Sequence, residues 1–357
     1  MPSSLSHRAA ARPAHPLRRA ALVVAGALGS AALLAGAVVG ARKWLSDRDI
    51  YAFPRTMFGP AFVYTVEGDN GEPVRVLNVR GTYQSATYLG ERYAEPVFAY
   101  YRAFDAMFGP GVPLDVRNVL MIGGGGYAYP KHLIATRPEA RIDVVEIDPV
   151  ITSIAERYFY LDRLIVEYET EETGRLGLIC ADGRAYLDEL ASAEHPTSAG
   201  HPASAEHPEP VGPEPVGPVP VGGLYDAIVL DSFGGREHVP TLVSLEAARV
   251  ARVCLNPGGL VLANIVAPTE GPGAGFLRSY VATLGEVFAH VHVVPVADGG
   301  ASSWGERASE QGECDNTLVI ATDSECSFED EVELFARSSD APGGVPILHD
   351  PKPRTRR

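Results

Sequence analysis

Residues 119–126 read Val-Leu-Met-Ile-Gly-Gly-Gly-Gly, and residues 144–149 read Val-Val-Glu-Ile-Asp-Pro. An apolar run that ends in glycines is typical of a buried parallel strand that turns tightly into a helix and leaves backbone N–H groups open to a ligand. Glu146 follows at the tip of the next strand, about twenty residues on, where a doubly wound sheet accepts hydrogen bonds from the hydroxyls of a ribose. The two stretches predict an α/β fold that binds an adenosine-type ligand.

The glycine run lacks the third glycine of the dinucleotide fingerprint, because residues 127–130 read Tyr-Ala-Tyr-Pro. Such a loop is poorly suited to hold a pyrophosphate. It therefore favours a nucleoside without phosphate, such as S-adenosylmethionine, over a nicotinamide or flavin. The structural alternative is a plain glycine turn, with Glu146 capping the helix that begins near Pro149.

Two further apolar runs, 176–181 and 225–230, end on the carboxylates Asp182 and Asp231. In open α/β sheets, ligands bind along the edge that these strand ends share. We expect Asp182 to accept a hydrogen bond from an adenine amino group and Asp231 to lie near the reacting atoms. Each aspartate taken alone also fits the N-cap of the following helix.

Together these motifs resemble the spermidine synthase (polyamine aminopropyltransferase) family, within the class I methyltransferase-like fold. The resemblance covers about residues 60–322. It includes segment 77–85, which is similar to the family's hairpin with a ligand-contacting Gln, here Gln84. The motifs are Gly123-Gly-Gly, Glu146-Ile-Asp, Asp182-Gly183, Tyr225-Asp226 with Asp231-Ser232, and Asn256-Pro-Gly-Gly259.

The resemblance implies a donor, S-adenosylmethionine or decarboxylated S-adenosylmethionine, and no metal. It implies that Asp231 is the catalytic base. The residues expected to bind the donor are Gln84, Gly123, Gly124, Gly125, Glu146, Asp182 and Gly183. The residues expected to line the acceptor pocket are Tyr83, Tyr100 and Ser232. A homodimer is a further expectation.

Two positions depart from the family's usual pattern, since glycine stands at Gly126 and Gly234 where the family usually has aspartate. Cationic amines need carboxylates for charge-assisted hydrogen bonds. The acceptor, a small molecule and in the first hypothesis an amine, therefore stays open. Segment 231–240 is more similar to spermidine synthase-like domains attached to membrane segments.

Three hypotheses follow. The first is an aminopropyltransferase, in which catalysis consists of aligning a nucleophile and removing its proton, with Asp231 as base. The second is a methyltransferase that uses S-adenosylmethionine itself. The third is a membrane-tethered, non-catalytic ligand sensor that kept the fold.

The amino terminus predicts a membrane anchor, because residues 21–41 have no charged side chain and are long enough to cross a hydrocarbon core of about 30 Å. A cleaved signal remains an alternative. The arginines and lysines on the two sides nearly balance, with a slight bias toward an external domain. The cytosolic origin of a sulfonium donor favours the cytoplasmic side, and we keep both orientations.

The remaining pattern predicts a doubly wound Rossmann-like sheet preceded by a small β-hairpin domain. The net charge of −15 argues against a nucleic-acid partner. Residues 191–223 are rich in Pro, Gly, Ala, His and Glu and read as a disordered insertion. The predicted parts are 1–48 (basic terminus and anchor), 50–110 (hairpin domain and a helix near residues 92–107), 115–322 (ligand-binding domain) and 323–357 (loose polar tail).

Overall fold

The computed structural model describes residues 49–68, 71–192, 225–232, 238–296, 316–332, 334 and 344–352. Contacts divide the chain into two units, Met1–Ala52 and Phe53–Arg357. Apart from the first residues of strand β1, every element described here lies in the second unit. The predicted anchor, residues 21–41, lies outside the described residues, and none of the described helices has the length and apolar character needed to cross a bilayer.

The predicted hairpin domain is a four-stranded sheet in the order β1-β2-β3-β4. Antiparallel pairing of β2 with β3 confirms the hairpin that the alternating apolar residues predict. At the next turn, Arg80 and Gly81 have φ angles of 53° and 86°, the positive values that a two-residue hairpin turn requires. The strands are β1 (Ile50–Thr56), β2 (Gly59–Glu67), β3 (Pro73–Val79) and β4 (Thr82–Tyr88).

The predicted helix near residues 92–107 is wrong in extent. The chain forms instead two 3₁₀ turns, η1 (Gly90–Arg92) and η2 (Phe104–Phe108), and a short helix α2 (Ala99–Ala103). Pro96 explains the interruption, because proline disfavours the helical conformation of the residue before it. Pro96 forms a β-bridge with Thr87 instead.

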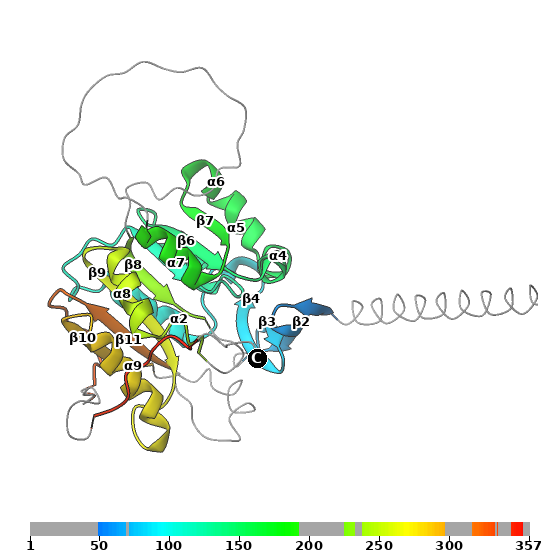
Figure 1. The fold of residues 1–357 in the computed structure, drawn as a ribbon. Coiled ribbons are helices and arrows are strands. Elements are labelled where there is room, and N and C mark those ends of the chain that lie inside the picture. The colour runs from blue at the N-terminus through cyan, green and yellow to red at the C-terminus, as the bar shows by residue number, and fades with distance from the viewer. Residues whose placement is uncertain are drawn as a thin grey trace, which may run out of the picture. The chain divides into compact units, whose positions relative to one another are not determined.

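The main sheet has seven strands in the order β10-β11-β9-β8-β5-β6-β7 (Figure 1). Strands β5 to β9 pair in parallel, and β11 pairs antiparallel to both β9 and β10. Every residue of β8 is buried, as expected for a central parallel strand. The strands are β5 (Asn118–Ile122), β6 (Arg141–Glu146), β7 (Leu176–Cys180), β8 (Tyr225–Leu230), β9 (Leu255–Val266), β10 (His290–Pro295) and β11 (Asn316–Thr322).

Numbered by their place along the chain, these strands follow the order 3-2-1-4-5-7-6, so the predicted doubly wound sheet is confirmed. The order reverses between β5 and β8, which makes that edge the expected ligand site. Helices α7, α8 and α9 pack side by side, and their apolar residues share one core cluster with β5, β8 and β9. The helices are α3 (Ala128–Thr136), α4 (Pro149–Tyr158), α5 (Leu161–Glu167), α6 (Thr170–Thr173), α7 (Gly183–Ser192), α8 (Leu245–Val253) and α9 (Gly275–Gly285), with a 3₁₀ turn η3 (Pro272–Ala274).

Two predicted boundaries are corrected. Helix α7 runs through Ser192, and Ala191 packs against the core cluster, so the insertion begins no earlier than residue 193. The predicted loose tail is wrong for residues 344–352, since the backbone N–H of Leu245 donates to the carbonyl of Leu348 at 2.8 Å. The polar composition of this segment did not predict that it packs on the domain. The packing depends on one apolar side chain, Leu348, and on ion pairs with residues distant in the sequence.

Candidate functional site

The predicted site residues converge on one edge of the sheet. The glycine loop follows β5, Glu146 ends β6, Asp182 follows β7 and Asp231 follows β8. Because these strands are neighbours and run in parallel, their carboxyl ends meet on both sides of the switch point between β5 and β8. The edge therefore joins the three carboxylates and the loop that sequence analysis selected.

Glu146 fixes the shape of the glycine loop. Its side chain is buried, and Oε2 accepts hydrogen bonds from the backbone N–H groups of Gly124 at 2.9 Å and Gly125 at 3.2 Å. Oε1 accepts a third from Asp148 at 2.9 Å. Burial raises the pKa of Glu146, and the backbone donors oppose that rise. The carboxylate has further lone pairs, so it can also receive ribose hydroxyls.

The loop needs glycine for reasons of space as well as conformation. Gly123 has a φ of 102°, and a Cβ atom there would lie 2.3 Å from the carbonyl oxygen of Asp231. Gly125, with a φ of 50°, faces the backbone of Gln84. The loop thus lies between the end of β8 and strand β4, with glycine required by space at Gly123 and by conformation at Gly125.

Gln84 and Tyr83 lie at an irregularity of the small sheet. Ser85 pairs with Leu77 and Tyr83 pairs with Asn78, which leaves Gln84 as the extra residue of a β-bulge. Bulges redirect side chains and are frequent beside functional sites. Tyr83 packs against the small cluster formed by Val74, Val76 and Ala86, whereas Ser85 faces Gly126.

Ser85 is a residue that the sequence analysis missed. It is fully buried, and its Oγ atom has no hydrogen-bond partner among the described residues. A Cβ atom on Gly126 would lie 2.5 Å from this Oγ and 3.0 Å from the ring of Phe159. Ser85 therefore excludes a side chain at Gly126, where the resembling family usually has aspartate.

Asp231 is held by two side chains. The amide of Asn264 donates to Oδ1 at 3.0 Å, and the hydroxyl of Tyr100 donates to Oδ2 at 3.4 Å. Burial raises the pKa of Asp231 to about 6, although both hydrogen bonds act in the opposite direction. Burial, and then the charge of Asp231, raise the pKa of Tyr100 well above 10, so its hydroxyl stays protonated. The result is a partly buried carboxylate whose pKa lies above that of an exposed aspartate.

Asn264 was also missed, although it is the polar residue inside the apolar run 260–266 of β9. An amide at a buried strand position needs a partner, and that requirement was the available signal. Strand pairing places Leu230 opposite Ala263, so the next residues along the two strands are Asp231 and Asn264.

The remaining predicted residues have structural contacts of their own. Asp182 is exposed, and its Oδ1 accepts from the N–H of Ala185 at 2.9 Å, as an N-cap would. A Cβ atom on Gly183 would lie 2.3 Å from Ile122, so glycine permits close packing of α7 on β5. Ser232 donates to the carbonyl of Ile122 at 2.8 Å.

An S-adenosyl ligand fits these residues. The expected open N–H groups are not found at Gly123, Gly124 and Gly125, because these groups donate to Val145 and Glu146. The lone pairs that remain on Glu146, and the Ser85 hydroxyl that lies against Gly126, are the polar groups left for the ligand. In the part of the chain that the structure describes, no group of three or more His, Cys, Asp or Glu side chains is arranged to hold a metal ion.

The sheet order and this edge define a spermidine synthase-like fold of the class I methyltransferase type. A solved structure of a probable spermidine synthase from Corynebacterium glutamicum ATCC 13032 superposes with a TM-score of 0.51 at 18% identity, covering 84% of this chain and 88% of that one. No protein-family model matches the chain.

Two curated relatives match parts of the sequence. The polyamine aminopropyltransferase of Vibrio vulnificus (strain CMCP6) is 29% identical over 148 residues, 41% of this chain and 37% of the relative. An eEF1A lysine and N-terminal methyltransferase homolog of Drosophila pseudoobscura pseudoobscura is 35% identical over 72 residues, 20% of this chain and 9% of the relative. The chain thus spans well under half the length of either curated relative.

Proposed function

We propose that the protein is a transferase that uses an S-adenosyl sulfonium donor, with aminopropyl transfer to an amine as the first candidate. The observation that supports this most is the partly buried Asp231 carboxylate, which Asn264 and Tyr100 hold on the same sheet edge as Glu146 and the glycine loop. The resemblance to polyamine aminopropyltransferases in sequence supports the same reaction class.

A bound sulfonium donor supplies a carbon already activated for transfer, together with a neutral thioether as the leaving group. The chain's own residues then have three tasks. Glu146 and Asp182 hold the nucleoside, and the glycine loop excludes side chains from its path. Asp231 takes the proton that the acceptor's nucleophilic atom loses, which a carboxylate with a pKa near 6 does readily at neutral pH.

Methyl transfer from S-adenosylmethionine is the second candidate, and the pairing of Ser85 with Gly126 favours it. Because Ser85 leaves no room for a side chain at Gly126, no carboxylate from this position repels the donor's own carboxylate. The match to a methyltransferase homolog over 72 residues supports the same alternative.

The deciding experiment is calorimetric titration of the full-length protein with S-adenosylmethionine, decarboxylated S-adenosylmethionine and methylthioadenosine. Micromolar binding of one sulfonium donor, followed by mass-spectrometric detection of methylthioadenosine or S-adenosylhomocysteine as product, would identify the reaction. Failure of all three compounds to bind would refute the proposed function.

We also propose attachment to a membrane through residues 21–41, with the domain on the cytoplasmic side.

A further inference from the structure

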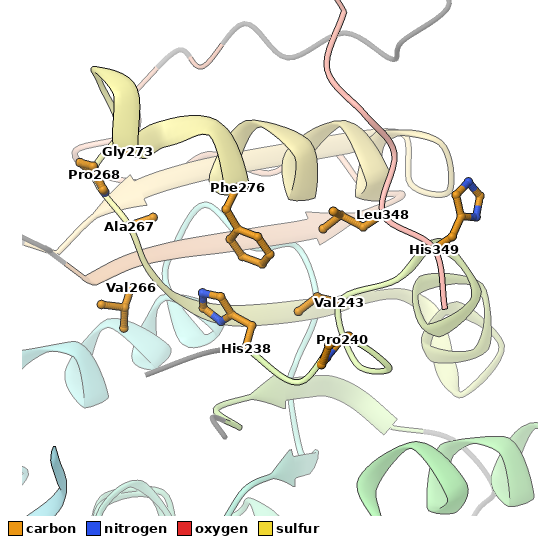
Figure 2. Close-up of a pocket in the computed structure, with 10 residues that line it drawn as sticks. All are labelled: His238, Pro240, Val243, Val266, Ala267, Pro268, Gly273, Phe276, Leu348 and His349. Atoms are coloured by element: carbon orange, nitrogen blue, oxygen red, sulfur yellow. The ribbon is translucent and has the colours of Figure 1, made fainter. Parts of the chain in front are cut away.

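An apolar pocket of about 420 Å³ opens at the end of β9 (Figure 2). Its volume lies within the range usual for small-molecule sites. The walls come from the loop before α8, the end of β9, the start of α9 and the more distant C-terminal segment. Its main lining residues are His238, Val243, Val266, Ala267, Phe276 and Leu348.

The pocket continues the series of strand ends that form the candidate site. Along the sheet edge the order is Asp182 after β7, Glu146 on β6, the glycine loop after β5, Asp231 after β8, and then the pocket after β9. Asn264, which is bonded to Asp231, and Val266, which lines the pocket, are two residues apart on β9. Two strand residues span about 7 Å. In the order of strand ends the pocket is therefore next to Asp231 and beyond it from the donor residues, and most of its lining lies on the face of the sheet that α8 and α9 cover.

The walls of the pocket are mainly apolar, and His349, whose Nδ1 lies 3.0 Å from Oε1 of Glu246, lines one end. In Figure 2 the rings of His238 and Phe276 point toward each other, and they stack with centroids 4.3 Å apart and planes 4° apart. Burial lowers the pKa of His238 to about 4, so its imidazole is neutral at pH 7. Among the described lining residues there is no Asp, Glu, Lys or Arg. An ammonium group would lose its hydration here without gaining a carboxylate, whereas an apolar ring would lose nothing.

The wall opposite β9 is held in place by hydrogen bonds. The N–H of Leu348 donates to Oγ1 of Thr283 on α9 at 2.9 Å. Two residues further on, Asp350 forms a bidentate ion pair with Arg184 at 2.9 and 3.0 Å. The C-terminal segment is thus anchored at Leu348 and at Asp350.

We infer that this pocket binds the body of the acceptor substrate, an uncharged apolar group with a planar face, so that the acceptor's nucleophilic atom lies toward Asp231. The inference rests on the proposed function, because Asp231 is taken as the base. It names a class of acceptor that differs from simple aliphatic polyamines, whose ammonium groups the pocket does not match.

The test uses the full-length protein saturated with methylthioadenosine and titrated with indole, a small planar apolar probe, and with putrescine, an aliphatic diamine. We expect indole to bind with a Kd of about 1 mM or tighter, near −4 kcal/mol, and putrescine not to displace it. Val266→Trp should fill the pocket and weaken indole binding at least tenfold. Phe276→Leu keeps an apolar wall without the ring face and should weaken it severalfold.

Val166→Trp is the matched control, because Val166 is an exposed valine on α5. It should leave indole binding unchanged. Absence of indole binding, equal binding by Val266→Trp and the control, or displacement of indole by putrescine would each overturn the inference. Methylthioadenosine is titrated separately, so loss of the pocket inference with intact nucleoside binding is distinguishable from failure of the proposed function.

Discussion

The side-chain amide of Asn264 donates a 3.0 Å hydrogen bond to Oδ1 of Asp231, across the boundary between two parallel strands. Tyr100 approaches the other carboxylate oxygen from the short helix α2. Each carboxylate oxygen thus has one protein donor and keeps lone-pair capacity for a substrate proton. The arrangement fixes both the orientation and the proton affinity of Asp231.

Loss of the Asn264 amide should change the pH dependence of transfer. The amide lowers the pKa of Asp231, so Asn264→Leu should move the acidic limb of kcat/KM upward from its expected position near pH 6. Tyr100→Phe should move it in the same direction by less, because its hydrogen bond is longer. An NMR titration of the Asp231 carboxyl measures the same shift without turnover. An unmoved limb in both variants would show that the clamp does not set this pKa.

Removal of the Asp231 charge should separate binding from chemistry. In Asp231→Asn we expect donor affinity within a few-fold of wild type and a transfer rate lower by about a hundredfold or more, the usual scale for loss of a general base. Ligand titration and single-turnover kinetics together measure the two effects. Full activity in this variant would exclude Asp231 as the base.

Glu146 and Asp182 should be replaced by residues that can still accept hydrogen bonds from the backbone. Both carboxylates accept such bonds in addition to their expected role in binding the donor. Glu146→Gln removes the charge and should raise the donor Kd by roughly ten- to a hundredfold, since a charge-assisted hydrogen bond is worth about 1.5–3 kcal/mol. Asp182→Ser keeps an N-cap for α7 while removing the carboxylate. Its Kd should rise while its melting temperature stays near that of wild type. Unchanged affinity in both variants would contradict the nucleoside assignment.

Lys131 should make stability depend on pH. It is buried, and its ammonium donates to the carbonyl of Phe159 and the hydroxyl of Thr87. Burial lowers its pKa from 10.5 to about 7. The unfolded chain therefore binds one more proton between those pH values, so stability rises with pH across this window and is lost as pH falls toward 7.

The contribution of Lys131 to that slope is about 1.4 kcal/mol per pH unit. Lys131→Met should remove it, as urea unfolding between pH 7 and 10 would show. Lys352→Met, at an exposed lysine, serves as the control and should keep the wild-type slope. Parallel slopes in wild type and Lys131→Met would mean that the lysine stays charged in the fold.

The sequence predicted most of the main sheet, because the central parallel strands are continuous apolar runs that end at the edge of the candidate site. The carboxylates Glu146 and Asp231 were found by the same rule. Ser85 and Asn264 were not, because their significance depends on contacts with Gly126 and Asp231 that are more than thirty residues away. Pro96 in the sequence was the available signal for the interruption of the helix predicted near residues 92–107.

The packing of residues 344–352 on the domain could not be predicted from the sequence, for a related reason. Its composition is that of a solvated tail, and its fixed position depends on a salt bridge whose partners are 166 residues apart. No local pattern of charge or hydropathy predicts that pairing.

The Arg184–Asp350 ion pair also has a consequence for the order in which the chain becomes structured during translation. Arg184 is the second residue of α7, and its guanidinium pairs with a carboxylate 166 residues later in the chain. At synthesis rates of about 5–20 residues per second, the intervening 166 residues take roughly 8–33 s to emerge. The ion pair that holds one wall of the pocket therefore forms long after the rest of α7 has been synthesised.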